Sequence, residues 1–462
     1  MKTVANTLLL IGLLWIVGTR ILVPGANIQP DSPRYVAAGL NIYEHGVLSG
    51  EGYKVDKAPV PGLYAGGVFT ALEIALAASI STDTYRDLVC VAMVSVDENC
   101  GQGLWALKGI YYFETVVFHL CVFVVGYLFF GRNLLGGWMT AVISLTFYDT
   151  FLYASSPLSE QGYLMLGGLF MASWAHAYER SDKLWPWALS GGLGGLLVLV
   201  KPAWLLLPLG LSVLPIIAFF IRRDDRLHVL KASLVFFVAF VLAVTPLIVR
   251  NALVLETFSM SQTSYLVSSL SHRFAFNLMS WKEWLIGWIY YLPLSGAQRM
   301  FGADALVPLG WDAGSYYEYG RDVLDKAAND GRTDLEARGY LLSHFVFEMP
   351  LKFVAVTALL LWRGIFVGHI VGMLAVPCVV TVMVFAESNY WRKWVFIFLP
   401  PFFMAGVNAA LSVSLYRYNL AMIIPYCLAM VWVALTTLNF LISRRNQHGF
   451  LATAKTFLPA TR

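Results

Sequence analysis

The sequence predicts an all-α polytopic membrane protein, and three observations point to this class. Of the 462 residues, 58% are hydrophobic and only 13% are charged, whereas about 25% are charged in a typical soluble domain. The mean hydropathy is +0.66. Apolar runs of about 20 residues recur along the chain, which is the length that an α-helix needs to cross a bilayer. Because lipid offers no partner for unpaired backbone groups, these runs should be helices.

About ten apolar runs are long enough to be spanning helices. The first run follows Lys2 and has the alternative interpretation of a cleaved signal peptide, although it lacks a clear small-residue cleavage site. The ten runs are residues 5–23, 105–130, 134–152, 160–178, 185–200, 203–221, 229–249, 366–386, 394–414 and 419–442.

The basic residues of the short loops predict the orientation of these spans. The loops on the opposite side hold little beyond Lys201 and Arg417. The basic side should be cytoplasmic, and with an even number of spans both termini lie there. The residues of the basic side are Arg132, Arg180, Lys183, Arg222, Arg223, Arg226, Lys231, Arg392, Lys393, Arg444 and Arg445.

This orientation predicts one polytopic domain over residues 1–445 and a short cytoplasmic tail over 446–462. Two long segments, about 24–104 and 251–365, then fall on the outer side, where loops and their borders tend to carry function.

Three apolar stretches in the outer segments are too short or too ambiguous for confident spans, and we expect interfacial or re-entrant helices there. They are residues 62–80, 281–292 and 351–363. Ser280 and Glu283 fit a capping box at the start of the second. If any of the three crosses the membrane, the count of spans and the parity argument change.

The most informative stretch is QPDSPRYVAAGLNIYEHG, residues 29–46. Ser32 is expected to cap an amphipathic helix that begins at Pro33. Asp31 precedes this cap at the membrane–water boundary, and Arg34 lies in the first turn. Such charges can be ordinary ion pairs of a solvated loop, but charge bordering an apolar setting favours function.

A second charged group follows in the sequence KVDKAPVP, residues 54–61. Asp56 and Lys57 lie just before two prolines, which hold the chain extended. An acidic and a basic side chain are therefore presented together on a stiff segment.

The order of these residues resembles the first outer loop of GT-C glycosyltransferases, in particular the protein mannosyltransferase-like branch and the lipid A aminoarabinose and galacturonate transferases. The resemblance covers most of residues 1–260 and 340–440, whereas 260–340 match no pattern that we can name. Its motifs are Asp31-Ser-Pro-Arg34-Tyr35, Asn41, Gly46, Asp56-Lys57-x-Pro59, Ser159-Glu160, Lys201-Pro202, Pro246-x-x-x-Arg250-Asn251 and Arg417-Tyr418 with Pro425.

Two departures from the family pattern stand out. A lone Asp31 followed by Ser32 replaces an acidic pair, which disfavours a two-carboxylate or metal-dependent mechanism. Leu247 replaces the tryptophan that precedes the family's arginine near the end of the seventh span.

The resemblance implies transfer of a sugar from a polyprenyl-phosphate donor to a glycolipid, polysaccharide or protein acceptor. The reaction would take place on the periplasmic or lumenal face, as in a bacterial inner membrane. It implies Asp31 as a general base acting with inversion. Independently of the resemblance, the net charge of +4 is too balanced for a nucleic-acid binder, the histidines lack the spacing of metal ligands, and no cofactor is expected. Cations would hold the donor phosphate, and further residues would bind sugar or acceptor or support the site. The first group is Lys57, Arg34, Arg250 and Arg417, and the second is Asp56, Glu160, Tyr35 and Tyr418.

Two other functions remain open at this stage. A secondary transporter or lipid flippase is disfavoured because such proteins show related halves and midplane sites, whereas this chain has no visible repeat and its charges lie at span ends. A non-catalytic envelope assembly subunit is the other alternative. A Cys90–Cys100 disulfide is possible in an oxidising compartment, and His119 and Asp149 are expected to be structural.

Overall fold

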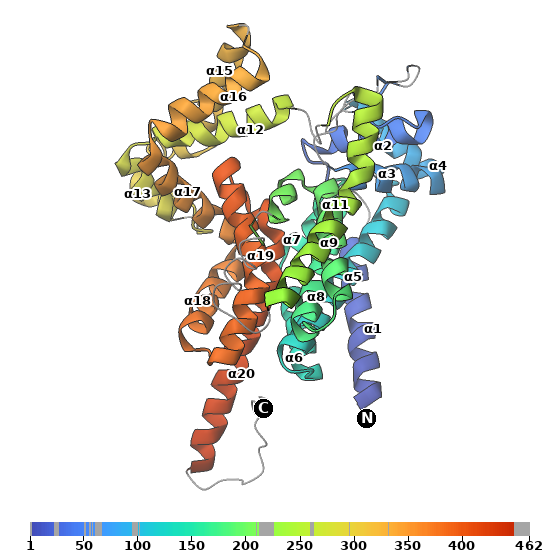
Figure 1. Cartoon of the computed structure of the whole chain (residues 1–462), viewed down its shortest axis with the longest axis vertical. Coiled ribbons are helices and arrows are strands. Elements are labelled where there is room, and N and C mark those ends of the chain that lie inside the picture. Colours follow the sequence, from blue (N-terminus) through green and yellow to red (C-terminus); the bar gives the residue numbers. More distant parts are fainter. Residues whose placement is uncertain are drawn as a thin grey trace.

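The computed structural model describes residues 2–22, 27–49, 52–54, 57, 59–60, 67–94, 100, 102–208, 210–211, 226–258, 263–294, 296–330 and 332–447. These residues form helices joined by turns and short irregular segments, with no strand among them. The all-helical polytopic architecture expected from the composition is confirmed at this level (Figure 1).

The two ends of the molecule differ in character (Figure 1). Helix α1 begins, and helix α20 ends, at one end of the bundle, while short helices gather in two groups at the opposite end. This arrangement places the two long segments that the sequence predicts on one side together. The two helices at the first end are α1 (Lys2–Ile21) and α20 (Ile423–Gln447). At the opposite end, the first outer group contains α2 (Ser32–His45), α3 (Val68–Ile80) and α4 (Thr82–Val94), and the second outer group contains α12 to α17 (residues 263–365).

A central bundle connects these ends and contains the largest apolar core. Trp174 stacks on Phe396 with ring centroids 4.4 Å apart. A Cβ added at Gly191 would lie 2.1 Å from the Phe236 carbonyl oxygen, so this glycine allows two helix backbones to touch. The bundle contains α5 (Trp105–Phe129), α6 (Leu134–Ser144), α8 (Glu160–Glu179), α9 (Trp185–Val200), α11 (Arg226–Leu255), α18 (Ile370–Phe385) and α19 (Ser388–Leu411).

Fewer helices than the ten expected are long and apolar enough to cross a membrane. Within the described part of the chain there are five, or six if one pair bent by 92° counts as a span. The five are Val4–Ile21, Trp105–Phe129, Leu227–Leu255, Tyr390–Leu411 and Tyr416–Ile442, and the bent pair is Asp334–Phe347 with Pro350–Ile365.

Of the other expected spans, 134–152 and 366–386 are shortened by breaks in the chain, whereas 185–200 keeps its expected bounds as the 16-residue α9. The run 134–152 divides into α6 and the short α7 (Asp149–Leu152), and α9 ends at Val200 because Pro202 follows Lys201. Helix α18 starts only after Gly368, whose φ is +74°. The run 160–178 does form a 20-residue helix, α8. Most of 203–221 lies outside the described residues.

The expected helices of the outer segments are present. Residues 62–80 contain α3, while 281–292 and 351–363 correspond to α13 (Trp281–Tyr290) and α17 (Pro350–Ile365). The predicted capping box at Ser280 is confirmed, since Ser280 and Glu283 each accept the other's backbone N–H.

The predicted cap of α2 is wrong. The helix begins at Ser32, one residue early, and Asp31 occupies the cap position without a side-chain cap bond. The Ser32 hydroxyl instead accepts the backbone N–H of Gln29 at 3.0 Å. The Asp31 carboxylate is therefore available for a partner outside its own helix.

The second outer group has apolar cores of its own. Arg273 of α12 is fully buried and donates to the Ala409 carbonyl at 2.6 Å, to Asn277 at 2.9 Å and to Thr357 at 2.7 Å. These bonds join α12 to α17 within the group and to α19 of the central bundle. The second outer group contains α12 (Thr263–Ala275), α13, α14 (Ala297–Phe301), α15 (Tyr316–Asn329), α16 (Asp334–Leu342) and α17.

Three structural expectations are resolved in the fold. His119 is buried and hydrogen-bonds Ser144 at 2.6 Å. Asp149 is buried and accepts the Gly368 N–H at 2.7 Å. Cys90 and Cys100 form a disulfide that joins the end of α4 to the segment entering α5.

Candidate active site

Asp31 forms an ion pair with Arg417, although 386 positions separate them in the chain. A guanidinium Nη2 of Arg417 lies 2.8 Å from Asp31 Oδ2. Asp31 is held at the start of α2, and Arg417 lies in the 3₁₀ turn η6 (Tyr416–Met422) that leads into α20. The Asp31 side chain is 54% exposed, so a ligand can reach it.

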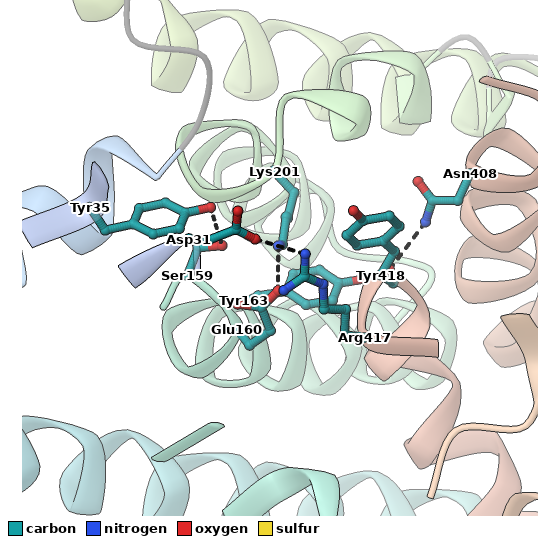
Figure 2. A network of polar contacts seen from close by, with 9 residues as sticks. All are labelled: Asp31, Tyr35, Ser159, Glu160, Tyr163, Lys201, Asn408, Arg417 and Tyr418. Atoms are coloured by element: carbon teal, nitrogen blue, oxygen red, sulfur yellow. Dashed lines mark hydrogen bonds and ion pairs between the residues drawn. The ribbon is translucent and has the colours of Figure 1, made fainter. Parts of the chain in front are cut away.

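A second ion pair lies deeper, between Glu160 and Lys201 at 2.9 Å (Figure 2). Glu160 begins α8, where the positive end of the helix dipole favours a carboxylate. Lys201 ends α9 in an extended conformation, just before Pro202. The Glu160 side chain is 2% exposed, so this pair is shielded from water.

Both cations lie near the Tyr418 ring. Lys201 Nζ is 5.5 Å from its centroid and Arg417 Cζ is 5.4 Å away. The Tyr418 carbonyl accepts Asn408 Nδ2 at 3.1 Å and the Tyr163 hydroxyl at 3.4 Å. These bonds from α19 and α8 hold the segment that carries Arg417 (Figure 2).

Tyr35 connects the outer helix α2 to the inner pair. Its hydroxyl lies 3.2 Å from Ser159 Oγ, one residue before Glu160. Burial, reinforced by the negative charge of Glu160, raises the pKa of Tyr35 above its ordinary value, so the phenol stays neutral. Gly67 allows this ring to fit, because a Cβ there would lie 2.3 Å from Tyr35.

The network contains two carboxylates and two cations, so its formal charge is balanced. Glu160 Oε2 and Arg417 Nε are both buried without a hydrogen-bond partner. These atoms leave one acceptor and one donor for a ligand within a water-poor site. Within the described residues, no group of three or more His, Cys, Asp or Glu side chains is arranged to hold a metal ion.

The remaining predicted site residues lie outside this network or outside the described residues. Arg250 donates to the Leu48 carbonyl at 2.8 Å and to Asn251 Oδ1 at 2.8 Å, which ties α11 to the segment after α2. Arg34 and Lys57 are exposed. In the part of the chain that is described, the ion pair of Asp31 is with Arg417, not with Lys57 or Arg250. Asp56 lies outside the described residues.

The structure thus brings together five predicted site residues and four residues that the sequence reasoning left out of the site. The predicted ones are Asp31, Tyr35, Glu160, Arg417 and Tyr418; those left out are Ser159, Tyr163, Lys201 and Asn408. One signal pointed to Lys201, because it and Arg417 are the basic residues that stand out in the short loops opposite the basic side. Ser159 precedes α8 in the Ser159-Glu160 motif, but the motif gave it no role in the site. Tyr163 and Asn408 are polar residues within apolar helices, and no pattern distinguishes them.

Comparisons with solved structures return distant similarities, including the two that follow. No family model matches the chain, and no curated protein matches it. The Archaeoglobus fulgidus oligosaccharyltransferase, in complex with Zn and sulfate, aligns at a TM-score of 0.45 and 13% identity over 97% of this chain. The alignment covers 52% of that protein, so this chain spans about half its length. ArnT from Cupriavidus metallidurans, bound to undecaprenyl phosphate, aligns at a TM-score of 0.34 and 12% identity over 99% of this chain and 84% of ArnT.

Proposed function

We propose that the protein is a GT-C-type membrane glycosyltransferase. It moves a sugar from a polyprenyl-phosphate donor to an acceptor hydroxyl on the non-cytoplasmic face. The observation that carries this proposal is the exposed Asp31 carboxylate, paired with Arg417 and adjoining the buried Glu160–Lys201 pair. The order of the motifs in the sequence supports the same reaction class.

Asp31 is the general base of the proposed reaction. As the acceptor oxygen attacks the anomeric carbon, its proton passes to Asp31, and the bond from that carbon to the phosphate oxygen breaks on the opposite side. The sugar is transferred with inversion, and polyprenyl phosphate leaves as an anion. A positioned base of this kind contributes roughly 10²–10⁴-fold in rate.

Arg417 has a positioning role, because its bond to Asp31 holds the carboxylate at the edge of the site. Glu160 binds a sugar hydroxyl through Oε2, the buried oxygen that has no partner in the protein. Tyr35 and Tyr418 form the walls of this part of the site.

Lys57 and Arg34 are proposed to hold the donor phosphate from the exposed surface of the first outer segment, with Arg250 as a further cation. Positive charge is needed there because the leaving phosphate gains negative charge as the glycosidic bond breaks. Asp56 is proposed to support Lys57.

The Cys90–Cys100 disulfide supports a non-cytoplasmic location for the first outer group. Disulfides persist in oxidising compartments and are rare in the cytosol. Cys90 lies in α4 and Asp31 directly precedes α2, and these two helices are at the same end of the molecule (Figure 1). This is the face expected from the basic loops, with the protein in a bacterial inner membrane.

The proposed base is tested by complementation. A strain that lacks the gene is supplied with wild type, Asp31→Asn or Asp83→Asn, and its envelope glycans are compared by mass spectrometry. Asp83 is the matched control, because it is a more exposed carboxylate (81%) of the same outer group. We expect Asp31→Asn to lose the sugar-bearing product roughly 10²–10⁴-fold and Asp83→Asn to restore it. Full restoration by Asp31→Asn removes the base assignment, and a solute that crosses the membrane without gaining a sugar indicates a transporter.

The donor cations are tested with the same glycan assay at graded polyprenyl-phosphate sugar. Lys57→Ala and Arg34→Ala each remove a charged contact worth about 1.5–3 kcal/mol, so the apparent affinity for the donor should fall about tenfold or more. The acceptor dependence should change less. Arg86→Ala is the control, because Arg86 is exposed on α4. Unchanged donor affinity in both variants contradicts their role.

A further inference from the structure

Arg363 stands out among the buried cations of the second outer group. Its guanidinium Cζ lies 4.1 Å from the Trp311 ring centroid and 4.7 Å from that of Tyr291. Its Nη1 is buried without a hydrogen-bond partner. No carboxylate among the described residues forms an ion pair with it, yet the residue is partly exposed and Trp311 is 38% exposed, so a ligand can reach it.

The position of Arg363 is fixed against the segment that carries Arg417. The next residue, Gly364, packs so tightly that an added Cβ would lie 2.3 Å from Ser414 Oγ. Asn419 Nδ2 donates to the Gly364 carbonyl at 3.0 Å. The end of α17 is therefore joined to η6, and Arg363 lies within electrostatic reach of Tyr418.

Aromatic side chains continue from Arg363 toward the candidate active site. Tyr317 contacts Trp311 with ring centroids 4.9 Å apart and stacks on His272 at 4.1 Å. Tyr317 is also within electrostatic reach of both Asp31 and Tyr418. The segment 260–340, which resembles no family pattern, thus supplies Trp311 beside Arg363 and Tyr317 against Trp311.

The charge balance of the site favours a ligand for Arg363. Lys201 and Arg417 are already neutralised by carboxylates. Arg273 is satisfied by carbonyl, amide and hydroxyl oxygens. A phosphate entering the balanced network needs a further cation, and burial of an unpaired guanidinium is costly unless an anion joins it. An arginine between aromatic rings is weakly hydrated and presents a planar fork that matches phosphate.

We propose that Arg363, between Tyr291 and Trp311, binds a phosphate group of a substrate in a subsite on the second outer group. The proposal deepens the proposed function and rests on it. The phosphate comes from one of two sources, the polyprenyl-phosphate donor or a phosphorylated glycolipid acceptor, and the chemistry of recognition is the same for both.

The test measures lipid binding to the purified full-length protein in detergent by native mass spectrometry. The probes are undecaprenyl phosphate, bisphosphorylated lipid A and, as the uncharged control, undecaprenol. The variants are Arg363→Gln, Arg363→Lys and, as a matched control, Arg299→Gln at an exposed arginine of the same group. Thermal unfolding of each variant identifies those that are folded.

We expect Arg363→Gln to weaken one phosphate-bearing lipid at least tenfold, Arg363→Lys to recover part of this loss, and undecaprenol binding to stay unchanged. Loss of undecaprenyl phosphate alone assigns the subsite to the donor, and loss of lipid A alone assigns it to the acceptor. If Arg363→Gln does not fold, the loss is measured with Arg363→Lys, which keeps the charge but not the fork. Binding of both phosphate lipids within twofold of wild type in every folded Arg363 variant overturns the proposal.

The outcome is separable from that of the glycan assay. If phosphate-lipid binding depends on Arg363 but the protein transfers no sugar, the subsite is supported and the proposed function is contradicted. If sugar transfer depends on Asp31 but lipid binding is unchanged in the folded Arg363 variants, the proposed function is supported and the subsite is contradicted.

Discussion

The inner and outer parts of the candidate site each contain one ion pair, and the two pairs differ in exposure. In the inner part, the side chains of Lys201 and Glu160 are 18% and 2% exposed. In the outer part, those of Arg417 and Asp31 are 23% and 54% exposed. The distances are nearly equal, 2.9 and 2.8 Å. Geometry alone therefore does not separate their roles, but exposure does.

The difference indicates that the inner pair supports the architecture and the outer pair is free to react. A buried ion that loses its partner has no water to replace it, so both members must stay. A carboxylate at the surface exchanges its partner for water or for a substrate at little cost. Asp31 can accordingly serve as a base without endangering the fold.

The largest expected effect on stability is at the inner pair. Glu160→Ala leaves Lys201 as an uncompensated, mostly buried charge and should lower the free energy of unfolding by about 3–5 kcal/mol. The double variant Glu160→Ala, Lys201→Met should regain much of this loss, because no unpaired charge remains. Chemical unfolding in detergent measures both. Equal losses in the single and double variants would show that the pair is not what stabilises this region.

An intermediate effect is expected where the outer helix α2 meets the inner pair. Gly67 has φ of +81°, and an added Cβ would strike Tyr35. Gly67→Ala should cost about 1–3 kcal/mol through backbone strain and a displaced ring. Tyr35→Phe, which removes the hydroxyl that contacts Ser159, should cost about 1 kcal/mol. If thermal unfolding shows a larger loss of stability for Gly67→Ala than for Tyr35→Phe, this connection is supported, and the reverse order contradicts it.

The smallest effect on stability is expected at the outer pair. Asp31→Asn should change the free energy of unfolding by less than about 1 kcal/mol, with a difference from wild type that shrinks at high salt. The same unfolding measurement, made at low and high ionic strength beside Asp83→Asn, checks this. If Asp31→Asn lowers the free energy of unfolding as much as Glu160→Ala does, Asp31 has a structural role, and the inner and outer ion pairs do not differ in their contribution to stability.

Arg363 extends the comparison to the second outer group. The first outer group carries the motifs that point to Asp31, whereas residues 260–340 of the second match no pattern that we can name. The contribution of the second group emerges only when α17 packs on η6. A long arginine near the end of an apolar helix is ordinary in sequence, since such side chains often extend to the interface. Its distinction lies in the two rings that cover it and in the absence of a carboxylate partner within the described chain.

The sequence by itself determined the helical class, the recurrence of apolar segments and the capping box at Ser280. These follow from local properties, namely apolar length and turn-by-turn hydrogen bonding. Asp31, Glu160 and Arg417 are predicted as site residues through the resemblance of their motifs to a known family. Tertiary structure alone decided that Asp31 pairs with Arg417, that Lys201 neutralises Glu160 and that fewer helices are of spanning length than the runs suggest. Contacts between residues hundreds of positions apart depend on how helices pack and where they break, and no local pattern carries that information.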